Sequence, residues 1–373
     1  MIEVRDATPA DNAALVDLSV ACPMEGDIGL AVDRAPDFFA LNRLEGDAWR
    51  VGVVDGPDGG PVGCIALAQR HVYLNGEATP AMYVSDLKVH PAHRGGGVAD
   101  ALTTWARDEC VAALGPRGLV FLTILAGNAG MERRMKGPRG LPQMERVATY
   151  RTHTIPLLHR RRPPRDAVVE VQRAGPEDLP DMASLWARLA PGHQLATVYD
   201  GLAAGAGSFA GWIEAAADLD LSDYRVARRA DGGLAGFIGV WDQSAIKRLR
   251  VTGYSPKLGA VRRVFNLLGP LVGGTKLPPP GGALRNLTAV HVCVPPEDPD
   301  VLRALVVGAY NESRRKGFSF LNVGLDVDDP LAVGLKGLLA QPTDIWVCVA
   351  FLEEPPAGLV GDGRPTHHEI ALV

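Results

Sequence analysis

The first 154 residues alternate between short apolar runs and amphipathic stretches. Runs of apolar or alternating residues predict strands at 2–7, 48–55, 62–72, 81–90, 118–124 and 144–153. Apolar residues at helical spacing predict helices at 9–19, 35–44, 97–114 and 128–136. No period is visible between residues 20 and 32, which are expected to form an irregular loop. This order predicts a mixed α/β domain that begins with antiparallel strands.

The rest of the chain follows a similar order more loosely. Strands are predicted at 224–229, 234–241, 286–294, 318–325 and 344–351, and helices at 177–190 and 300–315. An insertion at about 252–283 interrupts this order and contains Arg262-Arg263 and a proline run at 278–280.

The two halves also align directly. Residues 2–11 match residues 169–178 at an offset of 167 positions (169 minus 2), and Leu18 falls on Leu185. Between the copies, prolines and arginines predict a stiff, solvated connector. We therefore predict a first domain at 1–154, a linker at 155–167 and a second domain at 168–373.

The composition is that of an ordinary globular protein. The chain has 373 residues, of which 47% are hydrophobic and 22% charged, with a net charge of −5. This acidic balance argues against a dedicated nucleic-acid binder. The five cysteines are far apart in the sequence and include no C-x-x-C pair. We therefore expect neither a zinc cluster or other metal site nor a disulfide framework. The longest apolar stretch, 118–126, is too short to span a bilayer, and residues 1–6 do not resemble a signal peptide, so we expect a cytoplasmic protein without a membrane partner.

One glycine-rich run carries a chemical signal. The predicted strand 81–90 ends at Pro91, and Arg94 with three glycines then leads into the helix 97–114. Backbone N–H groups at a helix N-terminus bind anions, and glycines allow close approach, so a pyrophosphate would fit here. The run lacks the Lys-Ser/Thr of a P-loop and is not a dinucleotide G-x-G-x-x-G. A plain tight turn stays open as the alternative.

Arg94-x-x-Gly97-x-Ala99, preceded by Val89-His90-Pro91, resembles the acetyl-CoA signature of the GNAT acetyltransferase superfamily. The resemblance covers about residues 2–154 and implies an α/β fold with a mixed α+β sheet. It implies that acetyl-CoA, or another acyl-CoA, is held through its pyrophosphate by the backbone N–H groups of Arg94, Gly95, Gly96, Gly97, Val98 and Ala99. It further implies that Leu87 and Val89 pair with the pantetheine arm and that Asn128 lies near its end.

The layout of the second half is similar to that of the plant hookless proteins. The similarity rests on Gly239-Val240-Trp241-Asp242, a basic segment, a proline-rich insertion and a late Asp344-Ile345-Trp346. It implies two GNAT-like domains in tandem, of which the second is degenerate. At the matching strand end, residues 294–300 carry prolines and three carboxylates, which remove N–H donors and repel a pyrophosphate. The second domain is therefore expected not to bind CoA in the usual way.

Acyl transfer to an amine needs a base, an oxyanion donor and an acid for the thiolate. The resemblance places Asp86 where many members of the family carry a carboxylate, so Asp86 is a candidate base; an ion pair with Lys88 is the alternative. The family's usual acid, a tyrosine, falls in this register on Met135. Tyr83 and Tyr150 are substitutes, and for both a packing role stays open.

The acceptor region is expected near 22–37. Glu25, Asp27 and Asp33 could attract a cationic amine or form a solvated acidic loop. Nothing marks Cys22 as an activated nucleophile. The basic residues between Lys247 and Arg263 either bind an acidic group or form a solvated surface, and His367-His368 are expected to lie in a polar tail.

We therefore expect an acetyl-CoA-dependent N-acetyltransferase that transfers an acyl group to a primary amine of a small molecule or peptide by direct attack. A non-catalytic CoA-binding sensor or scaffold is the alternative. A third hypothesis is that the acceptor is a thiol or peptide, as in the tandem GNAT domains of mycothiol synthase. It differs from the first hypothesis only in the acceptor. A homodimer is left open.

Overall fold

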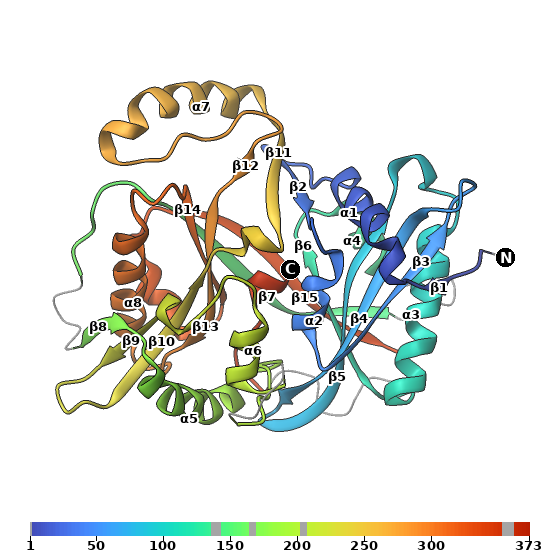
Figure 1. Ribbon diagram of the computed structural model, residues 1–373. Coiled ribbons are helices and arrows are strands. Elements are labelled where there is room, and N and C mark those ends of the chain that lie inside the picture. Colours follow the sequence, from blue (N-terminus) through green and yellow to red (C-terminus); the bar gives the residue numbers. More distant parts are fainter. Residues whose placement is uncertain (1, 136–142, 164–168, 202–206, 353–361) are drawn as a thin grey trace.

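A 12-stranded sheet runs through the whole molecule (Figure 1). It is seen in a computed structural model, which describes residues 2–135, 143–163, 169–201, 207–352 and 362–373. The strand order is β1-β3-β4-β5-β6-β15-β7-β14-β13-β10-β9-β8, and a separate three-stranded sheet has the order β12-β11-β2. The mixed α/β class predicted from the sequence is confirmed, with helices packed against a largely antiparallel sheet.

In its described residues, the first half supplies seven strands and four helices. The strands are β1 (Arg5–Asp6), β2 (Ile28–Asp33), β3 (Ala48–Asp55), β4 (Pro61–Leu74), β5 (Glu77–Val89), β6 (Leu119–Leu125) and β7 (Gln143–Pro156). The helices are α1 (Asn12–Ala21), α2 (Asn42–Glu45), α3 (Val98–Leu114) and α4 (Ala129–Met135). The predicted strands and helix α3 are confirmed with shifted ends, although the strand expected at 2–7 shrinks to β1.

Eight strands and four helices are described in the second half. The strands are β8 (Glu170–Arg173), β9 (Tyr224–Arg228), β10 (Leu234–Trp241), β11 (Arg248–Tyr254), β12 (Ala283–Leu284), β13 (Asn286–Cys293), β14 (Phe320–Asp326) and β15 (Gln341–Phe351). The helices are α5 (Leu179–Leu189), α6 (Phe209–Ala215), α7 (Pro256–Leu268) and α8 (Pro299–Ser313). Helix α8 joins the parallel strands β13 and β14, as α3 joins the parallel strands β5 and β6.

The last strand of each half pairs with the sheet of the other half. β15 is hydrogen-bonded to β6 from Ile345↔Leu125 to Ala350↔Val120, and β7 is hydrogen-bonded to β14 along Phe320↔Pro156 to Asp326↔Tyr150. β15 and β7 also pair with each other, so the two halves share one continuous sheet. Residues 164–167 of the predicted linker lie outside the described residues, and the predicted domain boundaries stay a prediction.

The segment expected to be an irregular loop at 20–32 instead contains a strand, so that prediction is wrong. Strand β2 pairs with β11, from Arg248↔Asp33 to Tyr254↔Ile28, and β11 leads into the insertion of the second half. A strand whose partner lies more than two hundred positions away gives no local hairpin signal. The helix expected at 35–44 is also wrong in extent, since only the single turn α2 and a preceding 3-10 turn, Phe38–Ala40, form there.

Strands β5 and β6 pair only from Ala81↔Leu119 to Val84↔Leu122 and then separate. β13 and β14 behave alike and pair only from Asn286↔Phe320 to Thr288↔Asn322. Each half therefore opens a wedge at the carboxyl end of its parallel pair. The two wedges have different contents, and this difference decides where a ligand can bind.

In the described part of the chain, no helix has both the length and the apolar character that crossing a bilayer requires.

Candidate active site

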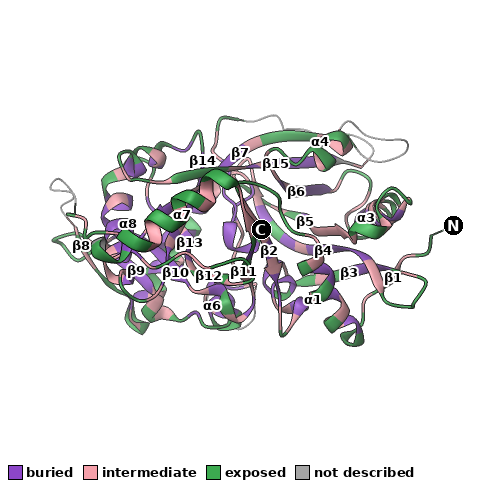
Figure 2. Cartoon of the chain, turned by 90° about the horizontal axis from the view of Figure 1, so that it is seen from above, coloured by how far each residue is buried: buried purple, intermediate pink, exposed green. Residues whose placement is uncertain are grey.

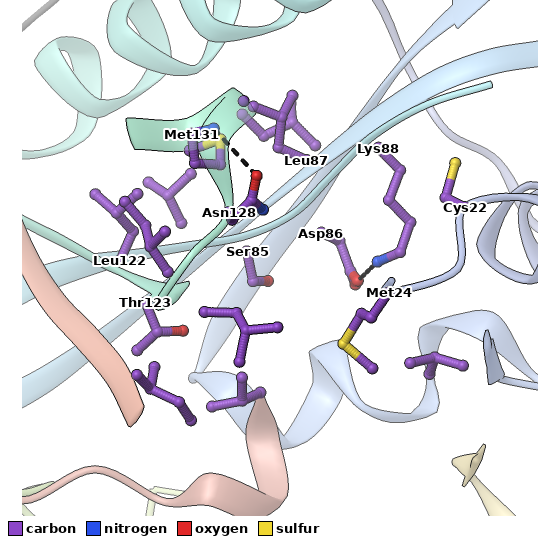
Figure 3. Close-up of a pocket in the computed structure, with 18 of the residues that line it drawn as sticks. Cys22, Met24, Ser85, Asp86, Leu87, Lys88, Leu122, Thr123, Asn128 and Met131 are labelled. Carbon is purple, nitrogen blue, oxygen red and sulfur yellow. Dashed lines mark hydrogen bonds and ion pairs between the residues drawn. The ribbon is translucent and has the colours of Figure 1, made fainter. Parts of the chain in front are cut away.

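A cavity of about 1540 Å³ opens where β5 and β6 separate. Both halves line it. The first half contributes β5, β6, the glycine loop and the start of α4, and the second half contributes residues around Lys247, Asn286 and Asn322. The shared sheet thus places side chains that are far apart in the sequence around one space (Figure 3).

The wedge of the first half exposes main-chain groups to this cavity. Past Val84 and Leu122, β5 still pairs with β4 on its other edge, while no described strand pairs with its edge toward β6. An extended pantetheine arm could add to that free edge as a strand does. Leu87 and Val89, for which the family resemblance implies this role, line the cavity here; the carbonyl of Val89 also accepts from Arg94 Nε at 3.2 Å.

The predicted anion loop stands at the N-terminus of α3. Gly95 and Gly97 have φ values of +81° and +84°, a region that favours glycine, and Gly97 is the N-cap of α3. A Cβ at Gly95 would meet nothing within 4 Å, so the loop lies open. Because the first N–H groups of a helix have no intrahelical acceptor, those after Gly97 are available to a phosphate. Arg107 and Arg133 also line the cavity and add positive charge.

Asn128 caps the helix that closes this end. Its Oδ1 accepts a hydrogen bond from the backbone N–H of Met131 at 3.2 Å, the dashed line in Figure 3. The cap fixes α4 beside the end of β6, and Asn128 lines the cavity there. Met135, which occupies the register of the family's usual tyrosine, packs against the apolar core under α3.

Asp86 sits at a bulge in β5. The register of β4 and β5 shifts between Cys64↔Lys88 and Ala66↔Ser85, and Asp86 has a φ of +53°, which aspartate tolerates better than most residues. Its carboxylate accepts from Arg34 Nη1 at 2.6 Å and from the ammonium of Lys88. Burial alone would raise the pKa of Asp86, but the charges and hydrogen bonds of Lys88 and Arg34 outweigh it and hold this pKa below the usual range. Asp86 is therefore an ionised carboxylate and a weak base.

Glu45, which the sequence analysis missed, lies beside Asp86. Its Oε2 accepts hydrogen bonds from Asn42 Nδ2 at 2.9 Å and from Ser85 Oγ at 3.1 Å, while its buried Oε1 has no partner among the described residues. Burial, and after it the charge of Asp86, raise the pKa of Glu45 to about 7. Glu45 lines the cavity. Two adjacent carboxyl groups whose pKa values are driven apart mark acid–base chemistry.

No sequence signal distinguishes Glu45 from other glutamates. It ends the single turn α2, and its position next to β5 depends on long-range packing, not on a motif.

Tyr83 lies where β5 and β6 begin to separate. Its hydroxyl is hydrogen-bonded to Thr123 Oγ1 at 2.9 Å, and both residues line the cavity. Burial raises the pKa of Tyr83, so the hydroxyl stays protonated near neutral pH. Tyr150 instead donates to the carbonyl of Gly324 and is absent from the cavity lining.

The three predicted acceptor carboxylates are separated in space. Glu25 lines the cavity, whereas Asp27 is exposed on the loop outside the lining. Asp33 is buried and bound by Arg248 at 3.3 Å and Arg250 at 2.7 Å. Burial would raise the pKa of Asp33, but its hydrogen bonds to Ala35 N and Arg250 and the charges of both arginines lower it. Only Glu25 of this set therefore faces the cavity.

The second half contributes Lys247 to the same cavity. Its ammonium donates to the main-chain carbonyl of Ala371 at 3.1 Å and to that of Val373. Burial, and after it the charge of Arg34, lower the pKa of Lys247 to about 8. The basic residues predicted as one cluster are thus divided: Lys247 faces the cavity, Arg248 and Arg250 bind Asp33, and Arg262 lies on α7.

The prediction that His367 and His368 lie in a polar tail is wrong. Both rings are buried. The ring of His368 is tilted against that of Tyr83, and the ring of His367 packs edge-to-face on that of Trp186, each with 5.2 Å between ring centroids. Burial lowers the pKa of His368 to about 3, so its ring is neutral. No group of metal-ligating side chains occurs among the described residues.

The wedge of the second half is filled by the chain itself. His291 N–H donates to Glu369 Oε1 at 2.9 Å on one strand, and Thr366 N–H donates to Asp326 Oδ2 at 2.7 Å on the other. Residues 366–370 therefore occupy the place that the first half leaves open. Helix α8 also begins at Pro299, with Asp298 as its N-cap and no glycine loop before it. The second half is degenerate as a CoA site for these two reasons.

The ion pair between Arg34 and Asp86 predicts a large stability effect. Arg34→Met removes the buried guanidinium beside Asp86 and Glu45, although Asp86 retains Lys88, and losing one partner of a buried pair costs about 3–5 kcal/mol. The matched control is Arg43→Met, because Arg43 is 48% exposed and its ion pair with Asp37 is worth about 0–1 kcal/mol. Urea unfolding of both variants measures the difference; equal losses of stability would contradict this account of the cluster.

Comparison with known proteins agrees with this geometry. Residues 24–122 match the family model of an acetyltransferase (GNAT) domain, and this segment contains β5, the glycine loop, α3 and the start of β6. No curated protein matches the sequence, so the similarity to the plant hookless proteins stays a prediction.

Several solved structures share the fold. A GCN5-related N-acetyltransferase from Sphaerobacter thermophilus is 15% identical, with 95% of this chain and 96% of that chain covered and a TM-score of 0.60. N-myristoyltransferase of Saccharomyces cerevisiae with bound myristoyl-CoA is 13% identical, with 100% and 85% covered and a TM-score of 0.62. A GCN5-related N-acetyltransferase from Anabaena variabilis is 12% identical, with 95% and 73% covered and a TM-score of 0.54. At such identities the likeness shows the fold, which is that of two GNAT-like units in tandem. Together with the matched domain, it supports acyl transfer as the general class of activity.

Proposed function

We propose that the protein is an acetyl-CoA-dependent N-acetyltransferase that acts on a primary amine of a small molecule or peptide. The observation that carries the proposal is the open wedge between β5 and β6, with a glycine loop at one end and a pair of carboxyl groups with opposed pKa shifts beside it. An acyl-CoA fits this order of parts: pyrophosphate at residues 94–99, pantetheine along Leu87 and Val89, and thioester near the bulge at Asp86.

The chain would perform the transfer in one displacement. The amine nitrogen attacks the thioester carbonyl carbon, and the carbon–sulfur bond breaks. The proton lost by the nitrogen passes to Glu45 Oε1, directly or through a water, and the leaving thiolate takes a proton from Tyr83. A main-chain N–H at the β5 bulge would stabilise the oxyanion.

Glu45 fits the base better than Asp86, which the sequence favoured. A carboxyl group with a pKa near 7 is half deprotonated at neutral pH and accepts a proton more readily than one held ionised by two cations. We assign to Asp86 a positioning role instead, because its negative charge raises the pKa of Glu45. Glu25, at the cavity surface, would attract the cationic acceptor.

Calorimetric titration with acetyl-CoA tests the binding half of the proposal. We expect one site per chain, because residues 366–370 fill the second wedge. A stoichiometry of two, or no heat of binding, would contradict the assignment.

A CoA-binding sensor or scaffold without turnover is the second candidate. It is favoured by one observation, namely that Met135, the residue in the register of the family's usual tyrosine, is a half-buried apolar side chain that packs against the core. Binding of acetyl-CoA without release of free CoA thiol, across a panel of primary amines, would favour this candidate over the enzyme.

A further inference from the structure

The helix α7 stands apart from both sheets. It is held out by β11 and β12, which run from the rim of the cavity to the top of the molecule in Figure 1. Its inner face is occupied: Arg262 Nε donates to the carbonyl of Leu277, and Asn266 exchanges hydrogen bonds with the main chain of Leu277. This segment is therefore a folded arm with one face turned away from the protein.

The outer face of the arm is apolar. Five aliphatic side chains are exposed there at helical spacing and in the turn that follows: Val261 (52%), Val264 (58%), Leu267 (76%), Leu268 (52%) and Leu271 (82%). Figure 2, seen from the side on which α7 lies, shows the helix largely exposed. Leaving such a contiguous group in water is unfavourable, and groups of this kind mark interaction surfaces.

The arm itself carries charge of one sign, although the exposed Asp27 lies next to its first residues, since Ser255 N–H donates to the carbonyl of Asp27 at 2.8 Å. Between residues 243 and 285 the sequence contains eight Lys or Arg residues and no Asp or Glu, although the whole chain has a net charge of −5. Three of the eight, Lys247, Arg248 and Arg250, are bound in the body of the protein. Lys257 and Arg263 remain exposed beside the apolar side chains of α7.

We propose that α7 docks on an anionic lipid surface, with its aliphatic face in the headgroup region and Lys257 and Arg263 near the lipid phosphates. A helix with an apolar face, basic flanks and no acidic residue has the composition of interfacial helices. A second copy of the chain fits less well, because two such helices packed together would bring cations against cations without a carboxylate between them. The sequence predicted no membrane partner, but that prediction rested on the length needed to span a bilayer, and α7 would lie on the surface.

Vesicle flotation of the full-length protein tests the proposal. The probes are vesicles of equal parts phosphatidylglycerol and phosphatidylcholine, and vesicles of phosphatidylcholine alone. We expect binding to the anionic vesicles, at least tenfold weaker binding to the neutral ones, and a steady loss of binding as NaCl is raised from about 50 to 500 mM.

Two double variants separate the apolar and the electrostatic contributions. Leu267→Asp with Leu271→Asp is expected to weaken vesicle binding by at least about tenfold, since two aliphatic groups can no longer enter the headgroup region. Lys257→Gln with Arg263→Gln is expected to weaken it by about thirty-fold at low salt. All four side chains are exposed, so the fold should be retained, and acetyl-CoA binding should be unchanged.

Matched controls lie elsewhere on the surface. Val333→Asp with Leu339→Asp changes two aliphatic side chains that are 52% and 61% exposed, and Arg188→Gln with Lys336→Gln removes two exposed charges. Both should bind vesicles like the wild type. The proposal is overturned if the wild type fails to bind anionic vesicles, if it binds neutral ones equally, or if the control variants lose as much as the α7 variants. It is equally overturned if light scattering shows a dimer that the Leu267 and Leu271 changes dissociate, because the occupant is then a second copy.

Discussion

Gly97→Glu is expected to abolish binding of acetyl-CoA, with an affinity loss of at least about 100-fold, or about 2.7 kcal/mol. Gly97 has a φ of +84°, so a side chain there strains the backbone that opens α3. The added carboxylate would also stand beside the N–H groups that hold the pyrophosphate and repel it. Isothermal titration of the purified variant with acetyl-CoA measures the loss.

The matched control is Gly115→Glu at the opposite end of the same helix. Gly115 has a φ of +77° and a ψ of 173°, a region even more restricted to glycine than that of Gly97, and a Cβ there would meet nothing within 4 Å, so the control carries the same charge change and no less backbone strain. We expect this variant to bind acetyl-CoA with the affinity of the wild type. Equal loss in both variants would show a general effect on α3 and would remove the support for a pyrophosphate site at residues 94–99.

Glu45→Gln is expected to lower kcat by about 100-fold or more while leaving acetyl-CoA binding unchanged. The substitution keeps the shape of the side chain and removes the group that accepts the amine proton, a contribution of about 10²–10⁴ in rate. In the wild type, kcat/KM should fall as the pH drops through about 7, because the carboxyl group of Glu45 is then protonated and cannot act as a base. The variant should lose this step in its pH profile.

Glu369→Gln provides the control for burial. Burial raises the pKa of Glu369 to about 7 as well, yet Glu369 is absent from the cavity lining. Its variant should retain the rate and the pH profile of the wild type.

Because the folded protein raises the pKa of Glu45 above its unfolded value, the ionised carboxylate costs stability above pH 7, so Glu45→Gln should melt no lower than the wild type at pH 8. A variant of Glu45 that loses activity only by unfolding would contradict the assignment.

The features predicted from the sequence are those with local causes. The glycine loop was recognisable because Pro91, Arg94 and three glycines stand between one strand and one amphipathic helix, and all of these interact within about twenty residues. Two features depend on contacts between distant segments: β2 pairs with β11, and β7 and β15 each pair with the sheet of the other half. Such contacts leave no periodic pattern in a single sequence, so they could not be predicted.

The candidate site divides in the same way. The sequence indicates Asp86 as a candidate base because it lies on the strand that precedes the glycine loop. Strand alternation places Lys88 on the same face, and the structure shows an ion pair between the two side chains. The second partner of Asp86, Arg34, and the neighbouring Glu45 lie just outside the segments for which a loop (20–32) and a helix (35–44) were wrongly predicted. The pKa of a carboxyl group depends on burial and on charges brought together by the fold, so the proposed base could be recognised only in the structure.

Amine-dependent release of CoA thiol from acetyl-CoA, followed with a thiol reagent and paired with mass spectrometry of the amine, tests the central claim most directly. The account predicts that at least one primary amine of a broad panel gains one acetyl group for each thiol released, at a rate that Glu45→Gln abolishes. Binding of acetyl-CoA without any amine-dependent thiol release, or release that Glu45→Gln leaves unchanged, would contradict it.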